Sequence, residues 1–95
     1  MIRIASVDMS SPGFGKSLKC IPPEKRAEAL SAIKALLQDP MPQRIRFEKL
    51  VSYKNPAIYT IHITRNHSHK ASFELIGATA VMRKVGTHKE IDREP

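Results

Sequence analysis

The chain has 95 residues, 41% of them hydrophobic and 26% charged, which is ordinary globular usage and allows one domain with a modest core. Lys and Arg outnumber Asp and Glu by 16 to 9, so a polyanion is the leading class of partner, ahead of an acidic protein or a merely soluble surface. Aromatic residues make up only 5%, too few for a base-stacking sheet, and the single Cys20 excludes an intrachain disulfide and a cysteine-based zinc site.

The N-terminal segment predicts a short strand, a loop and a short helix. Apolar and polar residues alternate over residues 1–7, and the Ser, Pro and Gly residues at 10–13 end this strand. Residues 14–20 fit a short helix whose apolar side continues to residue 21. That side consists of Phe14, Leu18 and Ile21. We expect the adjacent Cys20 to be a small buried hydrophobe.

A second helix is predicted from Glu24 to Gln38. Apolar residues recur there at spacings of three, three and four, which is the helical period. The predicted buried stripe is Ala27, Leu30, Ile33 and Leu37, with Leu36 beside it. Prolines at 40 and 42 end the helix. We expect this helix alone to cover one face of a sheet.

After Pro42 the period of the apolar residues changes to two, which predicts strands. The predicted strands cover residues 44–50, 58–64, 70–75 and 79–85, joined by turns at 52–56, 65–69 and 77–78, and a polar tail follows from residue 86. Strands joined by short turns pair antiparallel. The predicted fold class is therefore α+β: an N-terminal strand, one or two helices, and a four-strand antiparallel meander packed on the helix, all in one domain over residues 1–95.

The predicted meander also contains the residues best suited to phosphate chemistry. All four histidines are in the meander or in the tail that follows it: His62, His67, His69 and His88. Imidazole exchanges protons near neutral pH, and nearby cations stabilise charge on phosphate oxygens. Chelation of a metal by His67 and His69 is an alternative, but no Cys, Asp or Glu accompanies them. We therefore predict no metal and no cofactor.

Several other classes of protein are not indicated. The chain has no phosphate-cradling glycine loop, nucleophile elbow or zincin pair. No apolar stretch approaches the roughly 20 residues of a membrane span, and the N-terminus lacks a signal-peptide pattern. We expect a cytoplasmic protein with no membrane partner.

Four short motifs follow one another through the predicted meander. They are Lys49-Leu50, Tyr59-Thr60-Ile61-His62-Ile63, Lys70-Ala71-Ser72-Phe73-Glu74-Leu75, and Gly86-Thr87-His88-Lys89-Glu90-Ile91-Asp92. In this order and spacing they resemble the RelE/ParE toxin superfamily, and most of all its RelE- and HigB-like branch of bacterial type II toxin–antitoxin toxins. The similarity extends from about residue 14 to residue 93.

The resemblance implies a toxin that cuts mRNA in the ribosomal A site by attack of the RNA's own 2′-hydroxyl, without metal. The implied partners are a cognate antitoxin, the ribosome and mRNA, with no small-molecule cofactor. By position, the resemblance implies that His62 is the general base, Lys70 stabilises the phosphate and His88 protonates the leaving oxygen. It also implies RNA-binding roles for Arg46, Lys49, Arg65, Arg83 and Lys84.

The chain departs from the family pattern at two positions. Ile91 stands where the family usually has a tyrosine, and Thr60 stands where some members have a lysine. Isoleucine neither transfers protons nor stacks as an aromatic ring does. Two alternatives therefore stay open: a ParE-like toxin that inhibits DNA gyrase, and a decayed member that only binds its antitoxin.

Overall fold

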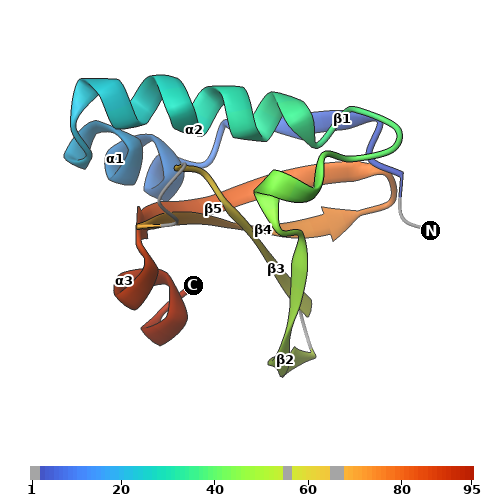
Figure 1. Ribbon diagram of the computed structural model, residues 1–95. Coiled ribbons are helices and arrows are strands. Elements are labelled where there is room, and N and C mark those ends of the chain that lie inside the picture. The colour runs from blue at the N-terminus through green and yellow to red at the C-terminus, as the bar shows by residue number, and fades with distance from the viewer. Residues whose placement is uncertain (1–2, 55–56, 65–67) are drawn as a thin grey trace.

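The computed structural model describes residues 3–54, 57–64 and 68–95, which form a five-stranded sheet with helices on both faces (Figure 1). The helices are α1 (Pro12–Cys20), α2 (Pro23–Ala35) and α3 (His88–Arg93), and a 3₁₀ turn, η1, spans Gln43–Ile45. The strands are β1 (Ser6–Asp8), β2 (Glu48–Lys54), β3 (Ala57–His62), β4 (His69–Ile76) and β5 (Thr79–Thr87). Within the described ranges, no helix has the length and hydropathy needed to cross a membrane.

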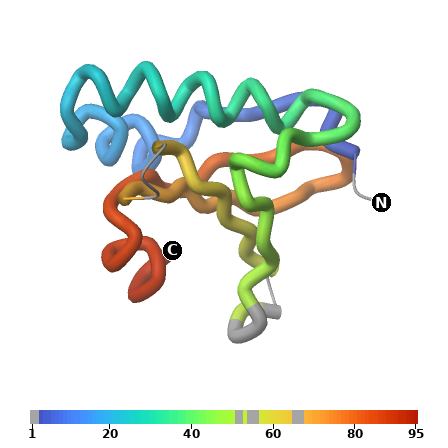
Figure 2. Tube along the Cα trace, viewed as in Figure 1, coloured from blue at the N-terminus to red at the C-terminus, as the bar shows by residue number. Residues whose placement is uncertain are grey.

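The strand order is β1-β5-β4-β3-β2, and the four strands from β2 to β5 form the predicted antiparallel meander. The α+β prediction is therefore confirmed. Strand β1 pairs with β5 in parallel, from Ser6 opposite Thr79 to Asp8 opposite Val81, so the sheet is mixed. The chain passes through both long helices and the meander before it returns to β1 (Figure 2).

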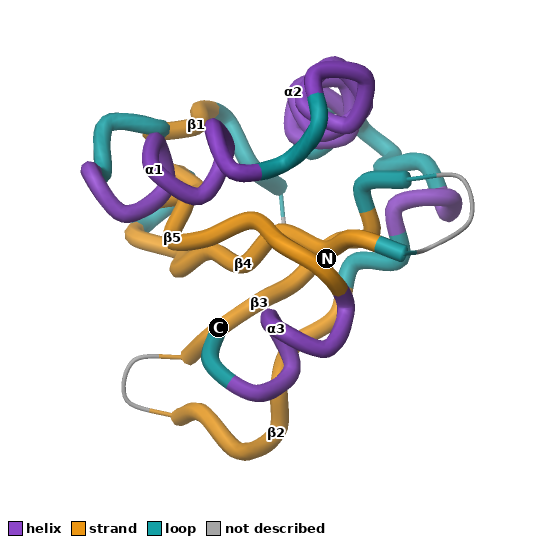
Figure 3. The backbone as a smooth tube through the Cα atoms, turned by 90° about the vertical axis from the view of Figure 1, so that its left-hand side faces the viewer, coloured by secondary structure: helices purple, strands orange, loops and turns teal. Residues whose placement is uncertain are grey.

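Helices α1 and α2 lie on one face of the sheet and α3 lies on the other (Figure 3). The apolar residues of the meander alternate toward α1 and α2, as a half-buried strand requires. The sheet's part of this core consists of Ile61, Ile63, Ala71, Phe73, Ala80, Met82 and Val85. Because α1 also contributes buried Phe14 to the core and contacts β5, the expectation that one helix covers this face alone is wrong.

Helix α2 packs through small residues rather than through the predicted leucine stripe. Its buried residues are Ala29, Ala32, Ile33 and Ala35, followed by Leu36. Leu30 and Leu37 are each 42% exposed, and Ala27 is exposed as well, so only Ile33 of the predicted stripe is in the core. Residues 29, 33 and 36 also recur at helical spacing, and alanine lets the helix backbone approach the sheet closely.

Several predicted boundaries differ from the structure. The strand expected from residue 44 begins at Glu48, because residues 43–45 form η1 and Arg46 has a left-handed φ of 46°. This strand continues to Lys54 through part of the predicted turn. Strand β1 is confined to residues 6–8, and Pro12 opens α1 instead of belonging to a loop. Cys20 is exposed, so the expectation that it is buried is wrong.

The prediction of a polar tail without secondary structure is also wrong, because β5 extends to Thr87 and α3 follows directly. Thr87 and Glu90 form a reciprocal capping box: the Thr87 hydroxyl accepts from the Glu90 backbone N–H, and Glu90 accepts from the Thr87 backbone N–H. Ile91 is fully buried, and α3 packs against β4 and β5. A capping box followed by one apolar residue is the signal that defines this helix.

Candidate functional site

Strands β3 and β4 place two of the predicted site residues side by side. His62 lies directly opposite Lys70 in the antiparallel register. Their neighbours Ile61, Ile63 and Ala71 face the core, so His62 and Lys70 project from the opposite face, the one that carries α3. His62 is 8% exposed and Lys70 is 3% exposed, which is unusually deep for a lysine.

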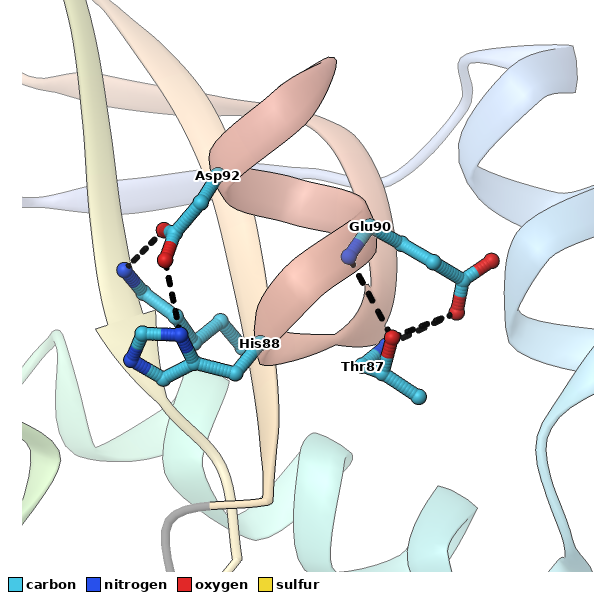
Figure 4. A network of polar contacts seen from close by, with 5 residues as sticks. Thr87, His88, Glu90 and Asp92 are labelled. Atoms are coloured by element: carbon cyan, nitrogen blue, oxygen red, sulfur yellow. Dashed lines mark hydrogen bonds and ion pairs between the residues drawn. The ribbon is translucent and has the colours of Figure 1, made fainter.

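Helix α3 brings two further side chains to the same place. His88 and Asp92 are four residues apart on this helix, and Asp92 accepts hydrogen bonds through both carboxylate oxygens. Oδ2 lies 2.7 Å from His88 Nδ1 (Figure 4), and Oδ1 lies 2.8 Å from Lys70 Nζ. The start of the helix is fixed by the capping box and by a 2.9 Å hydrogen bond from the His88 backbone N–H to the Ser68 carbonyl.

The two imidazole rings are neighbours, with centroids 5.5 Å apart and planes tilted by 54°. The structure therefore brings together all three residues predicted as catalytic, and it adds Asp92. We call these four residues the imidazole cluster: His62, Lys70, His88 and Asp92. One side of the cluster is open to solvent and the other is buried. The side chains of His88 and Asp92 are 49% and 44% exposed, whereas that of Lys70 is 4% exposed.

Electrostatics fix the ionisation state of Asp92. Partial burial raises the pKa of this carboxyl, but the hydrogen bond and charge of Lys70, with a further contribution from His88, more than offset burial and lower the pKa below its ordinary value. Asp92 is thus an anion at neutral pH. Its hydrogen bond to Nδ1 leaves the Nε2 atom of His88 directed away from the carboxylate and available to a substrate.

The capping box carries a second perturbed carboxyl, Glu90. Hydrogen bonds from the backbone N–H and the hydroxyl of Thr87, 3.0 Å and 2.9 Å long, lower the pKa of Glu90 (Figure 4). Glu90 therefore stays ionised and holds the first turn of α3, the turn that carries His88. Neither Asp92 nor Glu90 was assigned a role from the sequence, because this segment was not predicted as a helix. The i, i+4 spacing of His88 and Asp92 brings their side chains together only in a helix.

A cleft of about 870 Å³ opens beside the imidazole cluster. It lies between α2, the segment containing η1, and the end of β3. Helix α2 contributes Glu28 and Ser31, the η1 segment contributes Arg44 and Arg46, and His62 forms part of the wall. His62 is thus shared between the cleft and the cluster. Among the described residues, Arg46 is the one predicted RNA-binding residue that lines this cleft.

Three other predicted RNA-binding residues, Lys49, Arg83 and Lys84, lie outside this cleft. Lys49 is exposed on β2 opposite Tyr59, and Arg65 falls outside the described residues. Arg83 pairs with Glu74 at 2.6 Å, and Lys84 Nζ lies 3.3 Å from the Glu94 carbonyl oxygen. Arg83 and Lys84 line a separate cleft of about 370 Å³. The structure therefore does not place Lys49, Arg83 or Lys84 in the imidazole cluster.

The position of the family tyrosine is a packing position in this chain. Ile91 is fully buried, whereas its neighbours His88 and Asp92 are exposed. A side chain at position 91 therefore points into the protein and not toward a substrate at His88. Thr60, the other departure, is fully buried as well.

Metal ligands do not gather in the part of the chain that the structure describes. No three His, Cys, Asp or Glu side chains there are arranged to hold a metal ion. His69 Nδ1 lies 2.7 Å from the Ser68 hydroxyl, and His67, the other half of the alternative chelate, is outside the described residues.

Comparison with known proteins identifies the fold. No protein-family model and no curated protein matches the chain. Among solved structures, the RelB-RelE antitoxin-toxin complex from Methanococcus jannaschii contains a chain with 24% identity and a TM-score of 0.66, covering 90% of this chain and 96% of its own. The archaeal RelE-RelB complex from Pyrococcus horikoshii OT3 contains one with 13% identity and a TM-score of 0.62, covering 92% and 96%. Both similar structures are archaeal, whereas the motifs in the sequence resemble bacterial toxins. The chain therefore has the RelE-like toxin fold.

Proposed function

We propose that this chain is the toxin of a toxin–antitoxin pair, and that it cleaves mRNA in the ribosomal A site by attack of the RNA's own 2′-hydroxyl. The observation that carries the proposal is the imidazole cluster, in which two histidines and an ion-paired lysine meet at one point of a RelE-like fold. Such cleavage needs a base and an acid within reach of one phosphodiester, together with cations nearby.

In this mechanism, one imidazole is the general base and the other is the general acid. His62 removes the proton of the 2′-hydroxyl, whose oxygen attacks the adjacent phosphorus. The bond from phosphorus to the 5′-oxygen breaks, and Nε2 of protonated His88 donates its proton to that oxygen. The products are a 2′,3′-cyclic phosphate and a free 5′-hydroxyl. The 5.5 Å separation of the rings lets both reach oxygens of the same phosphodiester.

Lys70 and Asp92 act through His88 in this scheme. The ammonium of Lys70 is nearly inaccessible and bound to Asp92, so its charge serves first to hold that carboxylate in place. The carboxylate then fixes the His88 ring through Nδ1 and stabilises positive charge on it, as a buried aspartate does in a Ser-His-Asp triad. We therefore assign Lys70 as a positioning residue, in place of a direct contact to the phosphate.

The proposal is tested by translating a defined message with the purified protein and mapping new 5′ ends by primer extension. Wild-type protein should cut within codons on the ribosome and leave 5′-hydroxyl ends. His88→Ala and His62→Ala should each slow cleavage by about a hundredfold or more, the range for losing one acid or base group. Asp92→Asn should slow cleavage and change its pH dependence, because the ring loses its anionic partner.

His69→Ala is the matched control, because this histidine precedes Lys70 on β4 and bonds Ser68 instead of the cluster. It should cut at the wild-type rate. Intact messages with wild-type protein would overturn the proposal. Cleaved gyrase–DNA complexes in growing cells would then favour the ParE-like alternative, and unimpaired growth would favour a protein that only binds its antitoxin.

The same proposal includes an antitoxin, since both similar solved structures are complexes of RelE with RelB. A net charge of +7 favours an acidic partner that covers the basic surface. Coexpression with the product of the adjacent gene should restore growth, and the two proteins should copurify.

A further inference from the structure

We propose that the cleft between α2 and η1 holds the nucleotide next to the scissile phosphate, and that Glu28 reads the base of this nucleotide. This inference rests on the proposed RNA cleavage and adds a base preference to it. The cleft measures about 870 Å³, a size that accepts a nucleotide. The base expected there carries an exocyclic amino group, as cytosine, adenine and guanine do, whereas uracil does not.

His62 is common to the cleft and the imidazole cluster. This residue lines the cleft, and its ring is also 5.5 Å from that of His88. The cleft lies between α2, η1 and the end of β3, so a nucleotide that flanks a phosphodiester at the two rings would reach the cleft around the end of β3.

Two arginines give the cleft the charge to hold an RNA backbone. Arg44 and Arg46 are exposed at its edge, and neither forms an ion pair with any described residue. Arg83, in contrast, is paired with Glu74, and both line a separate cleft. A strand leaving the imidazole cluster is therefore attracted toward Arg44 and Arg46, because an uncompensated cation attracts a phosphate more strongly than one already paired.

Glu28 places a negatively charged side chain in the cleft, which phosphate binding does not need. It lines the cleft from α2, and its Oε2 atom is buried without a hydrogen-bond donor among the described residues. A carboxylate without a donor is costly, and it repels the backbone that the arginines attract. In the proposed complex, the carboxylate turns about its terminal torsion toward the cleft and accepts from an amino group, as glutamate does from cytosine N4.

The experiment uses the full chain in a purified translation system with a pool of messages. The pool varies every base around the cut site, and sequencing the cleaved ends gives the preference at each position. Wild-type protein should disfavour uracil at one position next to the cut by about tenfold, the effect of losing one hydrogen bond to a charged group. Glu28→Gln should reduce this preference at least threefold and leave the other positions unchanged.

Glu24→Gln is the matched control, because Glu24 is an exposed carboxylate one turn earlier on α2 and does not line the cleft. It removes the same charge and should keep the preference. A uniform gain in cleavage with Glu28→Gln, without a change in preference, would overturn the inference, since Glu28 would then only repel RNA. An equal effect of Glu24→Gln would overturn it as well. If no message is cut at all, the proposed function fails first, so the two failures are distinguishable.

Discussion

Two buried threonines near the imidazole cluster differ in what their hydroxyls do. Thr60 is fully buried on β3, and its Oγ1 has no hydrogen-bond partner in the described ranges. Thr64, also buried, follows the same strand, and its Oγ1 accepts from the backbone N–H groups of Ser68 and His69 at 2.9 Å and 3.2 Å. An unpaired buried hydroxyl costs free energy, whereas a paired one that satisfies backbone donors is costly to remove.

Valine substitutions at these two positions should therefore have opposite effects. Thr60→Val keeps the shape and removes the unpaired hydroxyl, so it should raise the free energy of unfolding by about 1 kcal/mol. Thr64→Val leaves two backbone donors without their acceptor and should lower it by about 2 kcal/mol. Urea unfolding measures both. A loss of stability in Thr60→Val would mean that the hydroxyl has a partner after all.

At the scale of the element, α3 is attached to the sheet by charge as well as by Ile91. Its contacts include the Asp92 bridge to Lys70 and the buried isoleucine. Because the folded pKa of Asp92 lies below its ordinary value of 3.8, the folded state binds fewer protons than the unfolded state as pH approaches that value. The stabilisation is therefore complete above 3.8 and disappears as pH falls through the lower, folded pKa.

Asp92→Asn should remove this part of the acid sensitivity. The free energy of unfolding of the wild type should fall more steeply with decreasing pH than that of the variant between about pH 5 and pH 2. The gap between the two should narrow across that window. Lys70→Met should flatten the wild-type curve in the same way, because it removes the first group that lowers the Asp92 pKa. Parallel curves for wild type and Asp92→Asn would show that the bridge does not stabilise the fold.

The elements also show which parts of the fold a single sequence can predict. Strands β3, β4 and β5 were predicted because alternation is a local property, and their register then places His62 opposite Lys70. Helix α3 was missed because five of its six residues are polar, so only the capping box and Ile91 indicate it. The prediction of which side of α2 is buried was wrong. Leucine is more hydrophobic than alanine, but close contact with a sheet favours small residues.

The candidate site was predictable only in part, for the same reason. Family resemblance selected His62, Lys70 and His88, but Asp92 becomes their partner only when residues 88–93 form a helix. The cleft depends on how α2 and η1 are placed around the end of β3, which comes later in the sequence. No local pattern encodes such an arrangement. Parallel pairing of β1 with β5 belongs to the same class, because it joins residues 6–8 to residues 79–81.

At the scale of the whole molecule, the net charge of +7 does not act as a single field. The protein measures 32 × 26 × 23 Å, whereas the Debye length at physiological ionic strength is about 8 Å. Charges on opposite sides are therefore screened from one another. An RNA strand is therefore attracted by the balance of cations and carboxylates close to it. Arg44 and Arg46 have no ion-pair partner among the described residues. Arg3, in contrast, is paired with Asp39, and Arg83 is paired with Glu74.

The salt dependence of RNA binding should reveal this local balance. Each phosphate neutralised by a protein cation adds about 0.7 to the slope of log affinity against log salt for a single strand. With a 2′-O-methyl oligonucleotide, which cannot be cleaved, Arg44→Ala and Arg46→Ala should each reduce the slope by about that amount. Arg83→Ala should leave it nearly unchanged, because Glu74 already compensates this cation. Equal reductions in all three variants would mean that RNA contacts the whole basic surface, and the cleft would then have no special part in holding it.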